Sequence, residues 1–205
     1  MLEAADLECA RGGRVLFRGL SFALKAGELL RIAGANGRGK TSLLRILCGL
    51  LAPAAGEVRW KGSPIGSLRE DYARELVYLG HAPAVKDDLT AAENLAIACR
   101  LAGSARSRSE VSAALRTLAV PEAALVRTLS QGQRRRAVLA RLCLSQAVPL
   151  WLLDEPLAAL DAQAARLVEG LVTGHVAQGG AVVYTTHQEA QLAGRVISLD
   201  AAGDA

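Results

Sequence analysis

The sequence has few aromatic side chains, which make up 3% of its 205 residues, and only four cysteines. The cysteines are widely spaced and form no Cys-x-x-Cys pair, which argues against a zinc site and against a disulfide framework. No run of about 18 apolar residues occurs, and the N-terminus lacks the basic start and apolar stretch of a signal peptide. We therefore expect neither a signal peptide nor a transmembrane helix.

The balance of apolar and charged residues is that of a globular chain. Apolar residues make up 51% of the sequence and charged residues 21%, far from the composition of disordered chains. The net charge is +4, but the arginines are scattered among acidic residues, so it gives little support for a nucleic-acid surface. We predict a single domain spanning residues 1–205 and expect no nucleic-acid partner.

Strand and helix patterns alternate near both ends of the chain. Residues 28–33 have the pattern of an apolar strand, 34–39 form a glycine-rich turn, and 40–50 have leucines at helical spacing. Near-continuous apolar strands of this kind are typical of a parallel sheet covered on both faces. Further strands are predicted at 150–154, 181–185 and 195–199, with a helix from Asp161 to about Val176.

The remaining segments have other patterns. Residues 7–24 indicate short strands broken at glycines, Gly19 among them, and 56–62 indicate a hairpin, so we predict a small antiparallel patch. From about Pro64 to Ser145 the pattern is helical and includes two Ser/Thr-x-x-Glu capping boxes. The predicted division is a catalytic core with the β patch, residues 1–81 and 146–200, and a helical subdomain, residues 82–145.

A phosphate-binding motif of the form G-x-x-x-x-G-K-[ST] follows a predicted strand and opens a predicted helix. Its glycines let several backbone N–H groups point inward, and Lys40 supplies a cation for the β- and γ-phosphates. The Thr41 hydroxyl is expected to bind Mg²⁺. The residues predicted to hold the nucleotide here are Gly34, Asn36, Gly37, Arg38, Gly39, Lys40, Thr41 and Ser42.

An acidic pair, Asp154 and Glu155, follows the predicted strand at 150–153. An Asp at the end of a strand beside the phosphate loop can hold Mg²⁺ through water. A Glu one residue further can polarise the water that attacks the γ-phosphate. The alternative is an acidic turn that caps the following helix. Beside the phosphate loop, we interpret Asp154 as a metal ligand and Glu155 as the catalytic base.

Two more motifs are Leu129-Ser130-Gln131-Gly132-Gln133, which opens a helix, and Thr185-Thr186-His187, which ends a strand. With the phosphate loop and the acidic pair, their order and spacing resemble the ATP-binding subunits of ABC transporters over essentially the whole chain. The resemblance implies an α/β fold with a P-loop NTPase core, and ATP and Mg²⁺ as cofactors. It also implies a head-to-tail dimer, in which Ser130, Gly132 and Gln133 meet the γ-phosphate of an ATP held by a second copy. A helix start with Ser and Gly is itself a natural anion site.

Further roles follow from the same resemblance. His187 resembles the switch histidine that contacts the γ-phosphate and the catalytic glutamate, and Asp161 the aspartate that couples the two sites of the dimer. His81 stands where a glutamine senses Mg²⁺ and the membrane partner. Arg11 occupies the place of the aromatic residue that stacks on adenine, and Phe17 is the other candidate for that contact.

Two of the departures from the family pattern lie in the dimer motifs. Gln131 replaces the first signature glycine and Ala158 replaces the usual small hydroxyl residue before Asp161. The substitutions spare Lys40, Asp154, Glu155 and His187, so we expect an ATPase in which Lys40, Glu155 and His187 are catalytic. A non-hydrolysing regulatory subunit is an alternative.

Among ABC subunits, three segments resemble the CcmA family of cytochrome c maturation: the N-terminal opening at Arg11, the run that begins at Val58, and Tyr78-Leu79-Gly80-His81. The resemblance implies a peripheral subunit at the cytoplasmic face of the bacterial inner membrane, with CcmB-like and CcmC-like integral membrane subunits as partners. ATP hydrolysis would drive haem export or delivery, although nothing in this chain is expected to bind haem directly. The alternatives are the ATPase of another small exporter and a soluble ABC-type ATPase that acts on nucleic acid.

Overall fold

The computed structural model describes residues 1–186 and 192–200. The strands are β1 (Leu2–Arg11), β2 (Arg14–Leu24), β3 (Leu29–Ala33), β4 (Ala55–Trp60), β5 (Ser63–Pro64), β6 (Leu76–Leu79), β7 (Leu150–Leu153), β8 (Ala181–Thr185) and β9 (Arg195–Ser198). The helices are α1 (Lys40–Leu47), α2 (Ile65–Leu68), α3 (Glu70–Arg74), α4 (Ala91–Leu101), α5 (Arg108–Thr117), α6 (Gln131–Cys143) and α7 (Ala162–Ala177), with a 3-10 turn at Val126–Thr128.

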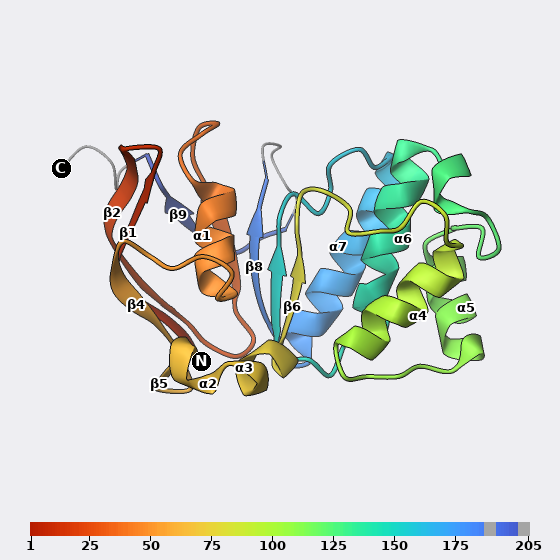
Figure 1. The fold of residues 1–205 in the computed structure, drawn as a ribbon, viewed down its shortest axis with the longest axis horizontal. Helices are drawn as coiled ribbons and strands as arrows, with labels where there is room; N and C mark the ends of the chain where they lie inside the picture. The colour runs from red at the N-terminus through yellow and green to blue at the C-terminus, as the bar shows by residue number, and fades with distance from the viewer. Residues whose placement is uncertain (187–191, 201–205) are drawn as a thin grey trace.

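A parallel sheet divides the molecule into two cores. Its strand order is β6-β7-β8-β3-β9, and all four neighbouring pairs are parallel. Successive side chains of β7 point to opposite faces, so Leu152 joins the core around α1 while Trp151 and Leu153 join the core around α7. Figure 1 shows α1 between the two sheets and α7 on the far side of the parallel one. The predicted α/β fold, with a parallel sheet covered on both faces, is confirmed.

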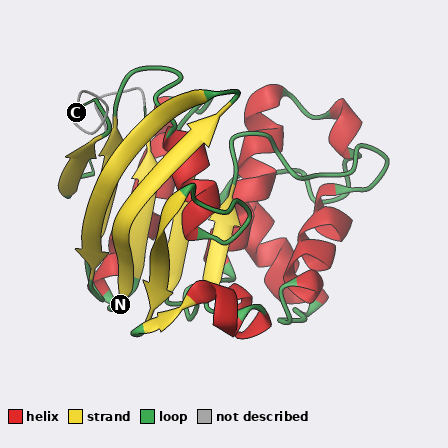
Figure 2. Cartoon of the chain, turned by 60° about the vertical axis from the view of Figure 1, so that its left-hand side comes forward, coloured by secondary structure: helices red, strands yellow, loops and turns green. Residues whose placement is uncertain are grey.

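The antiparallel sheet has the order β2-β1-β4-β5, and its two long strands curve across the front of the molecule in Figure 2. The expectation that Gly19 breaks a strand is wrong. Gly19 lies inside β2 with φ +66°, where the register against β1 shifts between Leu20 and Phe17. A left-handed glycine accommodates the extra residue of such a bulge, so the strand bends without ending.

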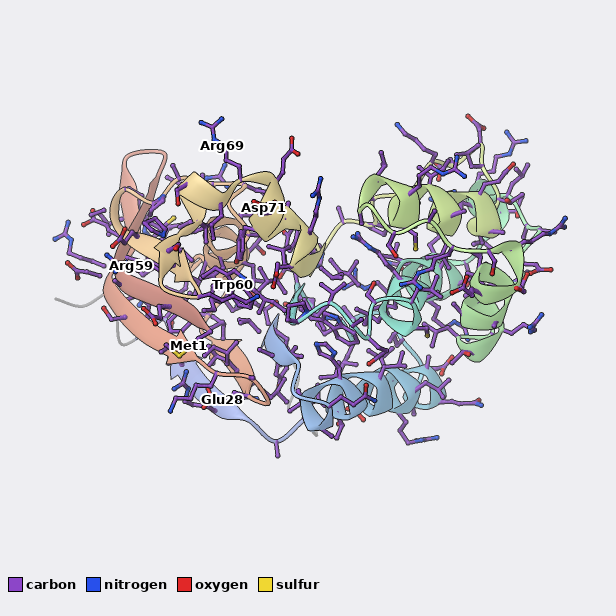
Figure 3. All side chains as sticks on the ribbon, turned by 90° about the horizontal axis from the view of Figure 1, so that it is seen from below. Met1, Glu28, Arg59, Trp60, Arg69 and Asp71 are labelled. Carbon is purple, nitrogen blue, oxygen red and sulfur yellow. The ribbon has the colours of Figure 1, made fainter. Side chains whose placement is uncertain are left out.

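The short helices α2 and α3 close one end of the antiparallel sheet. Figure 3 shows Trp60, at the end of β4, pointing into the molecule, while Arg69 and Asp71 point outwards. The Trp60 ring packs against Tyr72 of α3 with 5.8 Å between ring centroids. The Tyr72 hydroxyl donates a 2.6 Å hydrogen bond to the Leu47 carbonyl at the end of α1. These contacts attach the segment before β6 to the core around α1.

The segment predicted as helical contains one strand as well. Strand β6 was missed because a run of four apolar residues is too short to show a strand period. The helices α4, α5 and α6 pack on one another, and both predicted capping boxes are present, at Thr90 and Ser107. Helix α1 ends at Leu47, earlier than predicted, because Gly49 adopts φ +77° and stops the helix. Within the described residues, no helix has the length and apolar character needed to cross a membrane.

Candidate nucleotide-binding site

A hollow of about 320 Å³ opens at the carboxyl ends of β3, β6 and β7, beside the start of α1. The carboxyl ends of parallel strands are where α/β folds place ligands. The phosphate loop, His81 and the acidic pair, which are far apart in the sequence, meet here. The lining residues are Leu16, Asn36, Gly37, Gly39, Lys40, Thr41, Ser42, His81, Asp154 and Glu155.

The phosphate loop needs its last glycine. Gly39 precedes α1 with φ +98°, and a Cβ on it would lie 3.1 Å from the Cβ of Leu16 and 3.2 Å from Cδ1 of Phe17. Lys40 is 7% exposed, and its Nζ donates hydrogen bonds to the carbonyls of Gly34 (2.6 Å) and Ala35 (3.1 Å). Neutral carbonyls compensate a buried cation only partly, so the charged oxygens of a phosphate are stronger acceptors for this ammonium group.

The phosphate loop is also tied to the end of β9. Arg38 Nε and the Ala35 backbone N–H both donate to the same carboxylate oxygen of Asp200, at 3.1 and 3.2 Å. The Arg38 side chain, predicted to bind nucleotide, therefore has an anchoring contact within the protein. Sequence reasoning missed Asp200, because no local motif surrounds it.

Thr41 and Asp154 form the corner predicted to bind Mg²⁺. Thr41 Oγ1 donates to Asp154 Oδ2 at 2.8 Å, and the carboxylate is 1% exposed. Two such oxygens fit the hard ligands that Mg²⁺ prefers. Among the residues that the structure describes, no three His, Cys, Asp or Glu side chains gather as a metal site. A bound Mg²⁺ would therefore complete its shell with phosphate and water oxygens, as is usual at nucleotide sites.

Thr185 holds the acidic pair in place and was not assigned a role from the sequence. Its hydroxyl donates to Asp154 Oδ1 at 2.7 Å and accepts a 2.9 Å hydrogen bond from the Glu155 backbone N–H. The register that pairs Leu153 with Tyr184 places Thr185 beside Asp154. The signal that could have found Thr185 was its position at the end of a strand next to the strand that carries the acidic pair.

Glu155 has a left-handed backbone, with φ +54°. This conformation costs a non-glycine residue about 1 to 3 kcal/mol and persists only where neighbouring groups hold it. Thr185 holds the N–H of Glu155, and the Arg135 guanidinium donates to its carbonyl at 2.7 Å. Glu155 and Thr41 both line the hollow.

The two candidates for adenine stacking lie in different environments. Phe17 is completely buried in the core beneath Gly39, so its ring presents no face to a ligand. Arg11 is exposed at the end of β1, before the turn to β2. Leu16, which the sequence reasoning did not single out, lines the hollow itself. The burial of Phe17 therefore excludes it from stacking on adenine, and Arg11 is the candidate that remains exposed.

The signature motif opens α6 at a distance from the hollow. Ser130 caps the helix, accepting from the Gln133 N–H at 3.2 Å, while the Gln133 side chain accepts from the Ser130 N–H at 2.9 Å. The Gln133 side chain thus closes a capping box. A Cβ on Gly132 would lie 3.2 Å from the Ala159 carbonyl, so this helix start packs against the turn before α7. No residue lining the hollow comes from α6, in the part of the chain that the structure describes.

Asp161 and His187 are the two remaining predicted residues. Asp161 caps α7, accepting a 2.8 Å hydrogen bond from the Ala164 N–H. That contact uses one carboxylate oxygen, and the residue remains exposed. His187, predicted as the switch histidine, lies outside the described residues.

Comparison with known proteins gives the family of this chain. The family model described as ABC transporter matches residues 17–158. The cytochrome c biogenesis ATP-binding export protein CcmA of Nitrosospira multiformis is 51% identical over 198 residues, which are 96% of each chain. The CcmA of Aromatoleum aromaticum is 53% identical over 195 residues, covering 94% of this chain and 91% of the relative.

Solved structures share the fold. An ABC transporter ATP-binding protein from Pyrococcus furiosus superposes with a TM-score of 0.85 at 23% identity, covering 98% of both chains. A dimeric ATP-binding cassette in a post-hydrolysis state bound to ADP and Pi superposes with a TM-score of 0.84 at 23% identity, covering 97% of this chain and 94% of the other. At this identity the likeness shows the fold alone, whereas the relatives at about half identity show the family. The chain therefore belongs to the ABC transporter ATP-binding proteins and, among them, to the CcmA family.

Proposed function

We propose that this chain hydrolyses ATP to drive haem export or delivery for cytochrome c biogenesis, as a peripheral subunit at the cytoplasmic face of the bacterial inner membrane. The observation that carries the ATPase assignment is the hollow in which Lys40, Thr41, Asp154 and Glu155 converge. Its relatives at about half identity are named as ATP-binding export proteins of cytochrome c biogenesis, which supports the transport role.

In this proposal the phosphate loop binds and orients the triphosphate. Lys40 and the backbone N–H groups at the start of α1 receive the phosphate oxygens. Thr41 and Asp154 are the protein groups that would hold Mg²⁺, which would supply positive charge to the triphosphate. Glu155 accepts a proton from the attacking water, and His187 is assigned to orient the γ-phosphate beside it.

A second copy supplies the missing side of the site. The start of α6, with Ser130 and Gly132, is a place where a helix favours an anion, yet none of the described residues that line the phosphate hollow of the same chain comes from α6. In a head-to-tail pair, each helix start faces the γ-phosphate held by the other copy. ATP therefore joins the two copies, and its hydrolysis separates them.

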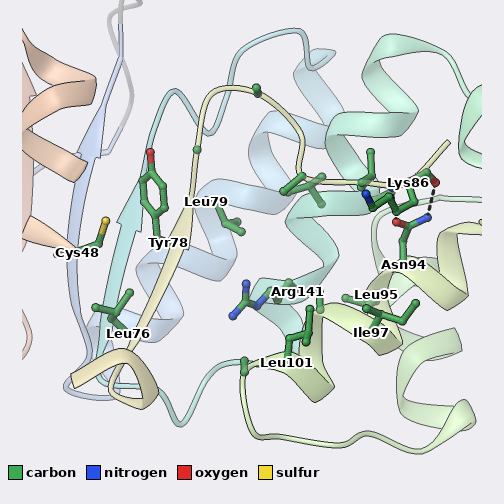
Figure 4. A pocket seen from close by; sticks show the side chains of 18 of the residues that line it. Cys48, Leu76, Tyr78, Leu79, Lys86, Asn94, Leu95, Ile97, Leu101 and Arg141 are labelled. Carbon is green, nitrogen blue, oxygen red and sulfur yellow. Dashed lines mark hydrogen bonds between the residues drawn. The ribbon is translucent and has the colours of Figure 1, made fainter. Parts of the chain in front are cut away.

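The groove for the membrane subunits lies between the end of β6 and helices α4 and α6. It is a cavity of about 500 Å³ (Figure 4), and its rim carries large apolar side chains that are unusually exposed: Leu101 (84%), Leu50 (70%) and Ile97 (46%). Contiguous exposed apolar surface of this kind marks an interaction site. We assign it to an apolar segment of a CcmB-like membrane subunit.

The charges that line the groove indicate what kind of segment of the membrane subunit would dock there. Among the described residues that line the groove, two are charged, Lys86 and Arg141; both are cationic, and none is acidic. Burial lowers the pKa of the Arg141 guanidinium, which has no hydrogen bond or ion pair within the described residues, and Figure 4 shows it directed into the groove. Arg141 is half-buried, and a partly buried cation is stabilised by a charged hydrogen-bond partner. The docking segment is therefore expected to carry a carboxylate.

The test begins with the chain isolated together with its membrane. Leu101→Asp places a charge on the groove, and Leu167→Asp, on exposed α7, is the matched control. We expect the CcmB-like and CcmC-like subunits to co-isolate with the wild type and the control, and to be lost with Leu101→Asp. Membranes carrying Glu155→Gln should lack haem-loaded c-type cytochromes. If the membrane subunits co-isolate equally with Leu101→Asp and Leu167→Asp, the groove is not their docking site. Normal haem-loaded cytochromes with Glu155→Gln would contradict the transport role.

The main alternative is a soluble ATPase that acts on nucleic acid. It predicts steeply salt-dependent binding of the purified chain to DNA or RNA, with no recovery in the membrane fraction. The proposal predicts the reverse on both measurements.

A further inference from the structure

Arg135 is a buried arginine that, within the part of the chain that the structure describes, binds four backbone carbonyls and no carboxylate. The side chain is 5% exposed. Its Nη1 donates to the carbonyls of Gly80 and His81, at 3.0 and 3.3 Å. Its Nη2 donates to the carbonyls of Asp154 and Glu155, both at 2.7 Å. One planar guanidinium thus joins the chain that follows β6 to the chain that follows β7.

The segment that follows β6 borders two surfaces of the molecule, and the segment that follows β7 borders one of them. Gly80 lines the groove assigned to the membrane subunit, whereas His81 and Glu155 line the nucleotide hollow. Helix α6, which carries Arg135, also lines the groove further along, at Val138 and Arg141. A shift of α6 or of the Gly80–His81 segment therefore reaches the Glu155 carbonyl through a single side chain.

Glu155 is the part of the site most sensitive to such a shift. Its left-handed backbone is held at the N–H by Thr185 and at the carbonyl by Arg135. Burial lowers the pKa of Arg135, while the charges of Asp154 and Glu155 oppose that shift, so the cation is retained here by its acidic neighbours and by carbonyl oxygens. Hydrogen bonds to carbonyl oxygens can lengthen or rotate without leaving a buried carboxylate unpaired. The Arg135 link can therefore adjust when the segments it joins move.

We propose that Arg135 is a positioning residue, which sets the backbone of Glu155 according to the position of the Gly80–His81 segment and so makes hydrolysis responsive to the groove. This inference rests on the proposed function, because it takes Glu155 as the base and the groove as the docking site. It adds a residue that neither the phosphate loop nor the signature motif includes.

The experiment compares Arg135→Lys and Arg135→Met with Arg134→Met, an adjacent arginine of α6 that forms a 3.1 Å ion pair with Asp87 near the surface. For each variant, kcat, KM for ATP, affinity for a fluorescent ATP analogue, and the thermal unfolding midpoint are measured. We expect Arg135→Met to lower kcat about 10- to 100-fold, less than loss of a base, with KM and affinity changed by less than about threefold. Arg135→Lys keeps the positive charge but loses the planar guanidinium with its several donors. Its kcat should therefore lie between those of Arg135→Met and the wild type.

A second measurement addresses the link to the groove. The ratio of ATPase rates with and without the co-isolated membrane subunits is compared for the wild type, Arg135→Lys and Arg134→Met. We expect Arg135→Lys to reduce this ratio at least about threefold while the control preserves it, since a merely structural loss would scale both rates alike. If Arg135→Met does not fold, the comparison of Arg135→Lys with the control still decides the matter.

Several outcomes would overturn the inference. The inference is wrong if Arg135→Lys leaves both kcat and the ratio of ATPase rates unchanged. It is also wrong if the Arg135 variants lose affinity, stability and rate together, with KM and kcat affected alike. Failure of the proposed function itself looks different, because Glu155→Gln would then hydrolyse ATP as fast as the wild type.

Discussion

The Thr41 hydroxyl donates a 2.8 Å hydrogen bond to the carboxylate of Asp154, 113 residues further along the chain. The first residue belongs to the phosphate loop and the second to the end of β7. Their contact brings the two halves of the candidate magnesium site together, and Thr185 anchors the other oxygen of the same carboxylate. The strength of the site thus depends on neutral hydroxyls that hold a buried charge, and this can be tested one residue at a time.

Lys40→Ala should weaken ATP binding about 10- to 100-fold, because a charge-assisted hydrogen bond to phosphate contributes about 1.5–3 kcal/mol. Lys40 is also the one lysine or arginine among the residues that line the hollow in the described structure. The measurement is titration calorimetry with ATP, and Lys25→Ala, an exposed lysine, is the control. An unchanged affinity of Lys40→Ala would remove Lys40 from the phosphate site.

Glu155→Gln should bind ATP and hydrolyse it about 10²- to 10⁴-fold more slowly, since the amide cannot take up the proton of the attacking water. ATP then persists between the two copies, so dimers should accumulate in size-exclusion chromatography with ATP. Glu70→Gln, on the exposed helix α3, serves as the control. A wild-type turnover no faster than that of Glu155→Gln would favour the non-hydrolysing alternative, and a monomeric variant with ATP would argue against the shared site.

Thr185→Val keeps the shape of the side chain but removes both of its hydrogen bonds to the acidic pair. The buried Asp154 carboxylate loses a donor, so the free energy of unfolding should fall by about 1–3 kcal/mol, and ATP hydrolysis should slow as Glu155 loses its backbone anchor. Thr173→Val removes an exposed hydroxyl on α7 that bonds the Glu169 carbonyl, and it should change stability by less than about 0.5 kcal/mol. Chemical denaturation measures both, and equal effects of the two variants would contradict the role of Thr185.

His175 should make stability depend on pH. The residue is 1% exposed, its ring stacks on Trp151 with centroids 3.8 Å apart, and neither ring nitrogen forms a well-aligned hydrogen bond among the described residues. Burial lowers the pKa of His175, and a weaker contact with the Gln146 backbone only partly opposes that shift. The unfolded chain takes up a proton near pH 6.5 that the folded chain refuses, so stability is complete above that pH and decreases as the pH falls through it.

The expected loss from this residue between pH 7.5 and 5.5 is up to about 1.4 kcal/mol. His175→Leu removes the titrating group, so its free energy of unfolding should change less over this range than that of the wild type, whatever its stability at pH 7.5. Urea denaturation at the two pH values measures the difference. The same pH dependence in both proteins would show that His175 does not contribute.

Much of the site was predictable because its chemistry is local. The run from Gly34 to Thr41 contains the glycines, lysine and hydroxyl of a phosphate loop in consecutive order, and the strand and helix around it follow from apolar periodicity. The capping boxes at Thr90 and Ser107 are likewise each contained within four residues. Such features need no knowledge of the rest of the chain, because turn geometry and helix capping are properties of neighbouring residues.

Other parts could not be read along the chain. Strand β6 is a four-residue run that becomes a strand only by pairing with β7. Phe17, an acceptable stacking residue by type, is buried beneath Gly39. Arg135 is one of three consecutive arginines in α6, and nothing in their order tells which of them is buried. In each case the partner lies tens of residues away, and the register and packing of other elements select it.

Consecutive residues were thus sufficient to establish the nucleotide chemistry and the family, since loops and caps form from their own atoms. The environment of each group depended on how the sheets and helices pack. That packing brings Thr41 and Thr185 to Asp154, directs Arg135 to four carbonyls, and leaves Arg141 facing an apolar groove. Burial and long-range hydrogen bonds arise from the folded arrangement of distant segments, and no linear pattern encodes them singly.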